Sequence, residues 1–198
     1  MLAAGRSRRM GARRKQLLPW GDSILLRAAL QPFTTLSLQR LVVVMGDEAE
    51  VAAPYLADVD YQLRVNPNPD AGMGHSLALG AAALPAEADC FFVALGDMPL
   101  VRPATLRTLL QAFAETCRRG VAAPVIVPVF DGRRGHPVLF DGARRAALTG
   151  LQGDRGAKEL LRQWGEAVVP CPVDDPGVVG DIDQPDDYRR LLAEAGII

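Results

Sequence analysis

Short apolar runs alternate with longer amphipathic stretches along most of the chain. Apolar runs bounded by Gly, Pro, Asn or Asp predict strands, whereas apolar residues at helical spacing predict helices. The predicted strands cover residues 41–45, 61–65, 91–95, 125–129 and 167–173, and a turn leads into a further strand over 132–140. The predicted helices cover residues 48–56, 73–84, 103–119, 153–164 and 184–195. This alternation predicts an α/β fold with a mostly parallel sheet and helices on both faces.

Length and composition fit one domain over residues 1–198, since a chain of 198 residues can bury about 70% of its unfolded surface. The sequence shows neither an internal repeat nor a low-complexity linker. Its apolar runs are too short to span a bilayer, so we expect no membrane partner. The three cysteines are odd in number and widely spaced, which indicates the reducing cytoplasm rather than a disulfide framework.

Positive charge is concentrated near the N-terminus. The formal net charge is -1, but six of the 22 Lys and Arg residues lie in residues 6–15, with no acid among them. This local charge predicts an anionic partner, whereas the overall balance gives no reason to expect nucleic acid. An Arg-rich, acid-free segment over residues 1–15 is also typical of an organelle transit peptide. Gly5, Gly11 and Pro19 make it a poor amphipathic helix, which favours the first interpretation.

The same segment has the composition of a phosphate-binding loop. Gly5 and Gly11 allow backbone amides to approach an anion closely, and Arg9 and Lys15 add full positive charges. Five residues separate the two glycines and Gln16 follows Lys15, so the loop is not a Walker A motif. A solvated basic loop is the alternative interpretation.

The strand expected before this loop is unusually short. A phosphate-binding glycine loop normally follows a central strand of the sheet. Gly5 has only four residues before it, whereas strands typically have about five or six. We therefore expect the natural chain to begin upstream of Met1.

Carboxylates follow two of the extended segments. Asp97 comes directly after the strand at 91–95, at the sheet edge where open α/β folds bind ligands. It can hold Mg²⁺, or it can cap a turn. In the extended run 181–183, Asp181 and Asp183 point the same way and offer either a second metal contact or a structural cap.

Two further segments combine glycine with polar side chains. Asn66 carries the donor and acceptor that a nucleobase edge requires, and Gly72 and Gly74 permit close approach at a helix start. His136 lies between Gly135 and a proline, where it can donate to an anionic substrate. The alternative for the segment after Asn66 is a turn that caps a helix, and the alternative for His136 is a purely structural role.

Taken together, six segments resemble the MobA-like NTP transferase family, and within it the molybdenum cofactor cytidylyltransferase branch. They are LAAGRSRRMGARRKQLLPWG at 2–21, NPNPDAGMGHSLALG at 66–80, LGDMP at 95–99, GRRGHPVLF at 132–140, GDRGAKELL at 153–161 and DIDQP at 181–185. The resemblance covers nearly the whole chain. It implies a Rossmann-like nucleotidyltransferase fold of three α/β/α layers.

The resemblance also implies roles for individual residues. Those implied to line the nucleotide are Leu2, Ala3, Ala4 and Gly5. Arg9 and Lys15 are implied to contact its phosphates and, with Asp97, to act in catalysis. Those implied to lie near the base and ribose are Asn66, Gly72 and Ser76. Those implied to face the acceptor are Gly135, His136 and Asp154. Asp97 and Asp183 are implied to bind Mg²⁺.

The implied reaction transfers CMP from CTP to the phosphate of the molybdenum-pterin cofactor and releases pyrophosphate, with a molybdoenzyme as a further possible partner. Ala4 stands where the guanylyl branch usually carries a second glycine, which favours CTP over GTP. Other phosphorylated acceptors, such as sugar phosphates, remain alternatives. A non-catalytic cofactor carrier is a third, although a carrier needs no metal-binding carboxylate.

Overall fold

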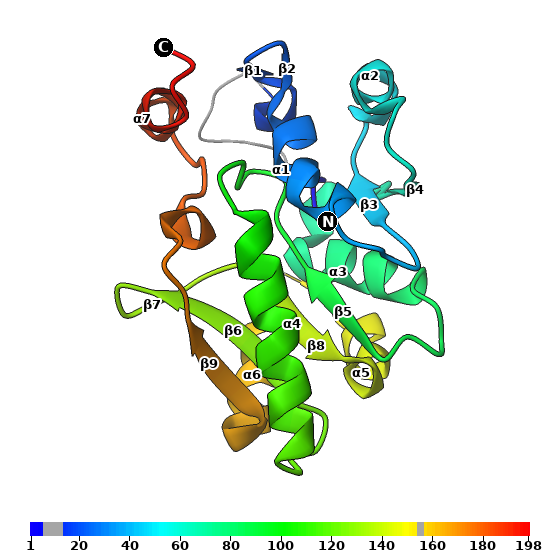
Figure 1. Ribbon diagram of the computed structural model, residues 1–198. Coiled ribbons are helices and arrows are strands. Elements are labelled where there is room, and N and C mark those ends of the chain that lie inside the picture. Colours follow the sequence, from blue (N-terminus) through cyan, green and yellow to red (C-terminus); the bar gives the residue numbers. More distant parts are fainter. Residues whose placement is uncertain (6–13, 154–156) are drawn as a thin grey trace.

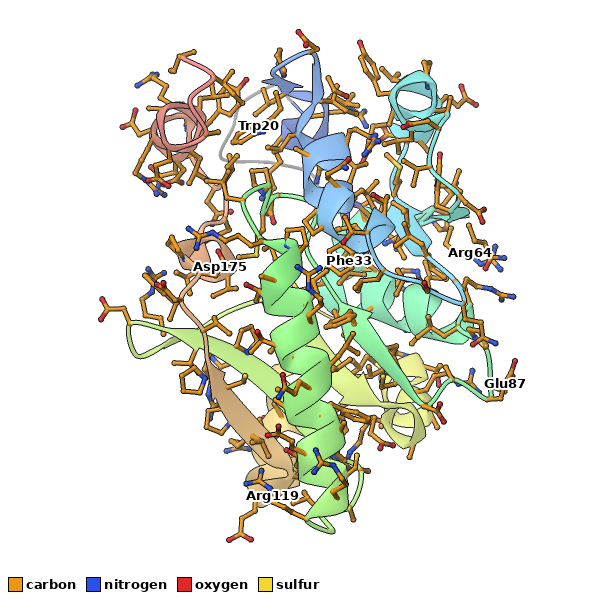
Figure 2. The ribbon with its side chains drawn as sticks, in the orientation of Figure 1. Trp20, Phe33, Arg64, Glu87, Arg119 and Asp175 are labelled. Carbon is orange, nitrogen blue, oxygen red and sulfur yellow. The ribbon has the colours of Figure 1, made fainter. Side chains whose placement is uncertain are left out.

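The computed structural model describes residues 1–5, 14–153 and 157–198, which form a sheet flanked by helices (Figure 1). The strands of the sheet are β3 (Val42–Met45), β4 (Gln62–Val65), β5 (Cys90–Val93), β6 (Val125–Phe130), β7 (Arg133–Arg134), β8 (Val138–Asp141) and β9 (Val168–Pro172). Leu2 connects the two halves of the sheet. It forms parallel bridges to Val44 of β3 and to Leu95, which lies just after β5. β3 pairs in turn with β4, and β5 with β8. The sheet order is therefore β4-β3-Leu2-β5-β8-β6-β9.

Most of the long strands of the sheet run in one direction. β3 pairs in parallel with β4, and β6 pairs in parallel with β9. β8 runs the opposite way between β5 and β6, and the short β7 forms a hairpin with β6. The prediction of a mostly parallel sheet is confirmed, and the reversed β8 is the strand that follows the predicted turn at 132.

Helices cover both faces of the sheet. The helices are α1 (Leu25–Thr34), α2 (Ala49–Ala52), α3 (Met73–Ala82), α4 (Pro103–Arg118), α5 (Arg145–Thr149), α6 (Lys158–Trp164) and α7 (Pro185–Glu194). In Figure 1, α1 and α4 lie in front of the sheet, whereas α3, α5 and α6 lie behind it. Within the described residues, every helix is too short or too polar to cross a membrane.

The alternation of side chains along β6 explains the two layers. Val125 and Val127 pack with Leu77 of α3 on one face, whereas Ile126 packs with Leu109 of α4 on the other. Successive residues of a strand point to opposite faces, so an unbroken apolar run requires cover on both sides.

Several elements differ from the sequence-based expectation, among them α5, which was not predicted. The helix predicted over 48–56 is divided into α2 and a 3₁₀ turn (Ala53–Leu56), because Pro54 supplies no N–H to continue the α-helix. The hairpin of β1 (Pro19–Trp20) and β2 (Ser23–Ile24), followed by α1, was not predicted. Helix α1 starts in a short, nearly continuous apolar run. Such a run is compatible with either a helix or a strand.

Gly135 allows two segments near the sheet edge to pack backbone to backbone. A Cβ atom at Gly135 would lie 2.0 Å from the carbonyl oxygen of Val178, well inside van der Waals contact. We expect Gly135→Ala to lower the free energy of unfolding by about 3 kcal/mol, because backbone must move to admit the methyl group. Denaturant titration measures this as a lower midpoint.

Gly150→Ala is the matched control for Gly135→Ala. A Cβ atom at Gly150 would meet its nearest neighbour, the carbonyl oxygen of Ala147, at 3.9 Å, and the backbone φ there is -87°. Its midpoint should stay close to that of the parent protein. An equal effect of the two substitutions would contradict the steric explanation.

Candidate functional site

The first residues of the chain lie at the centre of the sheet. The Leu2 N–H donates to the carbonyl oxygen of Ala94 at 2.8 Å, and the Ala3 N–H donates to that of Val44 at 2.8 Å. The segment therefore runs between β3 and β5 and ends at their carboxyl edge. This is the position that the sequence predicted for the strand before the glycine loop.

Only part of this segment is accessible to a ligand. The side chains of Ala3 and Ala4 are buried in the core, Leu2 is half-buried and Gly5 is exposed. The predicted contact of these four residues with a nucleotide can therefore involve mainly Gly5 and the backbone beside it. The small side chains of the two alanines instead allow residues 3 and 4 to pack closely against the neighbouring strands.

Gly96 brings Asp97 close to the same segment. The Gly96 N–H donates to the carbonyl oxygen of Leu2 at 2.8 Å, and a Cβ atom at Gly96 would lie 3.0 Å from the Cβ of Ala3 and 3.0 Å from Leu26. A larger residue would press the two segments apart. Asp97 thus follows β5 at the edge where the chain enters its basic loop.

Lys15 lies against two of the predicted metal ligands. Its Nζ donates to Asp97 Oδ2, to the carbonyl oxygen of Ile182 at 2.9 Å and to Asp183 Oδ1 at 3.4 Å. The exposed fractions of the side chains are 12% for Lys15, 15% for Asp97 and 43% for Asp183. Residues from three distant parts of the sequence therefore form one charged cluster, as predicted.

The charges of this cluster influence one another. Burial acts to lower the pKa of Lys15, but the carboxylates of Asp97 and Asp183 outweigh it and raise that pKa, so Lys15 is cationic at neutral pH. Partial burial raises the pKa of Asp181, and the charges of Asp97 and Asp183 raise it further. Three carboxylates near one lysine leave excess negative charge, which favours a further cation.

Asp97 has an oxygen that can bind such a cation. Its Oδ2 accepts from Lys15, but its buried Oδ1 has no hydrogen-bond partner within the part of the chain that the structure describes. A buried carboxylate oxygen without a partner is costly, and a bound metal ion removes that cost.

The donor set fits magnesium held together with a phosphate ligand. Mg²⁺ commonly binds through one or two carboxylates, and substrate phosphates and water supply its other ligands. Asp97 and Asp183 provide such a pair. Among residues 1–5, 14–153 and 157–198, no group of three or more His, Cys, Asp or Glu side chains forms a metal cage.

His136 forms a neighbouring part of the site. The backbone N–H of His136 donates to the carbonyl oxygen of Val178 at 2.8 Å. The preceding residue, Gly135, packs closely against the same oxygen. Burial lowers the pKa of His136, although the charge of Asp97 opposes this effect. The imidazole is thus neutral at pH 7 and can offer a ligand one N–H, whereas its predicted contact with an acceptor stays a prediction.

The lowered pKa of His136 predicts a pH-dependent stability. Between the lowered folded pKa and the ordinary value of about 6.5, the unfolded chain binds more protons than the folded one, so stability falls as pH falls. We expect the parent protein to lose more stability than His136→Phe below pH ~6.5, by up to about 1.4 kcal/mol per pH unit. Urea titrations at several pH values measure the difference.

His75 provides the control, because the chain has two histidines. His75→Gln keeps His136, so it should still show the greater loss of stability below pH ~6.5. A parallel stability profile for His136→Phe and the parent protein would contradict the assignment.

The segment after β4 is held together by its own polar side chains. Asn66 is 1% exposed; its Nδ2 donates to Ser76 Oγ at 2.9 Å, and its Oδ1 accepts from the Asn68 N–H at 2.9 Å. Both ends of the Asn66 amide therefore stabilise the loop instead of being presented to a base. A place for Asn66 and Ser76 near the base and ribose stays a prediction.

Two glycines shape the start of α3 beside this loop. Gly72 precedes the helix with a φ of 91°, which glycine adopts readily. The Gly74 N–H donates to the carbonyl oxygen of Gly153 at 2.9 Å, and a Cβ atom at Gly74 would lie 2.7 Å from that oxygen. Residue 153 therefore lies at the start of α3. The predicted site residues Arg9 and Asp154 lie outside the described residues.

Two features of the site were not predicted. Gln16 is 2% exposed, and its Nε2 donates to the carbonyl oxygen of Gly5 at 3.5 Å across the loop. Arg14 donates to Asp47 Oδ2 at 2.6 Å and to Glu48 at 2.9 Å. The signal used for Asp97, an acid directly after a buried strand, also marks Asp47 and Glu48 after β3.

Comparisons with known proteins found similarity over most of the chain. A family model described as the MobA-like NTP transferase domain matches residues 1–168. A relative named nicotine blue oxidoreductase, from Paenarthrobacter nicotinovorans, is 31% identical over 200 residues, which cover 97% of this chain and 94% of the relative. Purine catabolism protein PucB from Bacillus subtilis (strain 168) is 32% identical over 207 residues, covering 97% and 95%.

Solved structures show the same fold. The crystal structure of Rv0371c from Mycobacterium tuberculosis H37Rv has a TM-score of 0.81 and 33% identity, covering 97% of this chain and 94% of that chain. Another structure of Rv0371c, described as a complex with manganese, has a TM-score of 0.76 and 31% identity, covering 97% and 95%. The predicted α/β nucleotidyltransferase fold is therefore confirmed.

Proposed function

Because this chain belongs to the MobA-like NTP transferase family, we propose that it transfers CMP from CTP to the phosphate of the molybdenum-pterin cofactor, with release of pyrophosphate. The observation that carries the proposal is the cluster of Lys15, Asp97 and Asp183 at the carboxyl edge of the sheet. A lysine and a carboxylate with an available buried oxygen are the groups that a triphosphate and its metal ion require.

The chemistry needs little acid–base assistance. A terminal phosphate oxygen of the acceptor attacks the α-phosphorus of the nucleotide, a new P–O bond forms, and the bond to pyrophosphate breaks. The attacking phosphate is already ionised at neutral pH, so catalysis depends on alignment and charge neutralisation. Lys15 and Arg9 would bind the phosphates. Asp97 and Asp183 would hold Mg²⁺, which would neutralise phosphate charge.

The base and the acceptor rest on the resemblance of the motifs. Ala4 favours cytosine, and the segments carrying His136 and Asp154 favour the molybdenum-pterin acceptor. A molybdoenzyme that receives the product and a cytoplasmic location belong to the same proposal. Manganese enters as an alternative metal, because the similar Rv0371c is described in complex with it.

A redox function is the second candidate, because one relative is named an oxidoreductase. The charged cluster favours nucleotidyl transfer, since a hydride transfer needs neither a metal-binding carboxylate nor a lysine paired with that carboxylate. A phosphorylated acceptor other than the pterin is the closer alternative and leaves the chemistry unchanged.

A pyrophosphate-release assay separates these functions. The purified protein is given each of the four nucleoside triphosphates with molybdenum-pterin cofactor and Mg²⁺ or Mn²⁺, and parallel samples contain a sugar phosphate, or NADH with a dye as electron acceptor. We expect release with CTP and the pterin. Release only with a sugar phosphate would replace the acceptor. NADH oxidation without pyrophosphate would refute nucleotidyl transfer.

A further inference from the structure

Lys15 contacts three oxygen atoms that lie beside Asp97 Oδ1, the atom available to the proposed metal ion. Its ammonium contacts Asp97, Asp183 and the carbonyl oxygen of Ile182, all of them oxygen atoms that also attract a divalent cation. The Lys15 side chain is 12% exposed and the Asp97 side chain 15%, so solvent screens this contact only in part. A metal ion bound at Asp97 Oδ1 would lie next to the ammonium on Oδ2 of the same carboxylate, and the two positive charges would repel each other strongly.

We propose that Lys15 is the resting counter-ion of the metal site, and that metal binding displaces its ammonium toward the triphosphate. The inference rests on the proposed function in one respect, namely that the ion binds at Asp97 and Asp183. The four-carbon stem of lysine allows the ammonium to move while the backbone of the 3₁₀ turn (Lys15–Leu17) stays in place.

This exchange gives Lys15 two successive partners. Without ligand, it neutralises part of the charge of Asp97 and Asp183 and so stabilises the folded site. Metal and nucleotide together replace that role, because the ion neutralises the carboxylates and the triphosphate receives the released ammonium. Mg²⁺ alone should therefore bind weakly, and CTP should strengthen its binding, which is a reciprocal coupling of the two ligands.

Lysine NMR tests the displacement in the unaltered protein. The chain contains two lysines, Lys15 and Lys158, and Lys158 is exposed on α6. With ¹³C at the lysine ε-carbons, the spectrum holds two signals, which a Lys158→Met protein assigns. Mg²⁺ with a non-hydrolysable CTP analogue should shift the Lys15 signal, because the ammonium leaves the two carboxylates for the triphosphate. The Lys158 signal should not change.

Calorimetry of Mg²⁺ without nucleotide tests the competition. Lys15→Met removes the charge and keeps most of the side-chain volume, and Lys158→Met is the matched control. We expect Lys15→Met to bind Mg²⁺ at least about tenfold more tightly than the parent protein, equivalent to about 1.4 kcal/mol. CTP should then strengthen Mg²⁺ binding less than it does in the parent protein.

The outcomes distinguish this inference from the proposed function. Mg²⁺ binding that requires Asp97 but is equal or weaker in Lys15→Met overturns the exchange and leaves nucleotidyl transfer intact. Mg²⁺ binding to neither protein overturns the exchange, and pyrophosphate release then decides the proposed function separately. If Lys15→Met does not fold, an unchanged Lys15 signal in metal-bound parent protein still overturns the proposal.

Discussion

The Asp97→Asn protein is expected to lose nearly all metal-stimulated pyrophosphate release. The substitution keeps the shape of the side chain but removes the charge at Oδ1, the buried oxygen that has no hydrogen-bond partner among the described residues. Loss of a group that stabilises developing phosphate charge typically lowers kcat on the order of 100-fold to 1,000-fold. Initial rates measured over a range of Mg²⁺ concentrations should therefore be low and nearly flat.

Asp131→Asn is a suitable control for Asp97→Asn. Asp131 lies in the exposed turn between β6 and β7, where φ is 47°, a conformation that asparagine also tolerates. Its rates should match those of the parent protein. Circular dichroism should show that both variants are folded. Mg²⁺ stimulation that persists in Asp97→Asn would contradict the assignment of Asp97 as a metal ligand.

Most elements of the fold could be predicted, since they carry clear periodic signals. Strands β3 to β6 and helices α3, α4 and α7 lie within about two residues of the predicted ranges. Helix α1 was missed although Arg27, Gln31 and Thr34 form a polar stripe at helical spacing, because Pro32 and the short apolar run before it obscure the period. The direction of β8 depends on the hairpin geometry after β6, and a pattern of apolar residues does not contain that information.

The composition of the site was more predictable than its geometry. The position of Asp97 after a buried strand and the basic loop ending at Lys15 indicated one anionic ligand site, and the structure brings both residues together with Asp183. The pairing of Asn66 with Ser76 was not predictable, because these two residues, ten apart in the sequence, become neighbours only when α3 packs beside the loop. Residue types indicate possible chemistry, whereas pairing decides which groups remain available.

Lys15→Met should lower kcat on the order of 100-fold or more, even though it should bind Mg²⁺ more tightly. In the proposed reaction, the ammonium stabilises charge that grows on the α-phosphate and on the leaving pyrophosphate. Methionine provides neither charge nor N–H groups, so the rate of the chemical step falls. Rates are measured at saturating CTP, acceptor and Mg²⁺, so that a change in affinity does not obscure a change in kcat.

Lys158→Met controls for the loss of a lysine elsewhere in the molecule and should keep the parent kcat. Near-normal turnover in Lys15→Met would exclude a role for Lys15 in phosphate chemistry. Its contact with Asp97 and Asp183 would then be purely structural. Tighter metal binding combined with slower turnover is the distinctive result, because a structural lysine has no reason to oppose the metal while promoting the reaction. That combination would link the resting ion pair to catalysis through the same side chain.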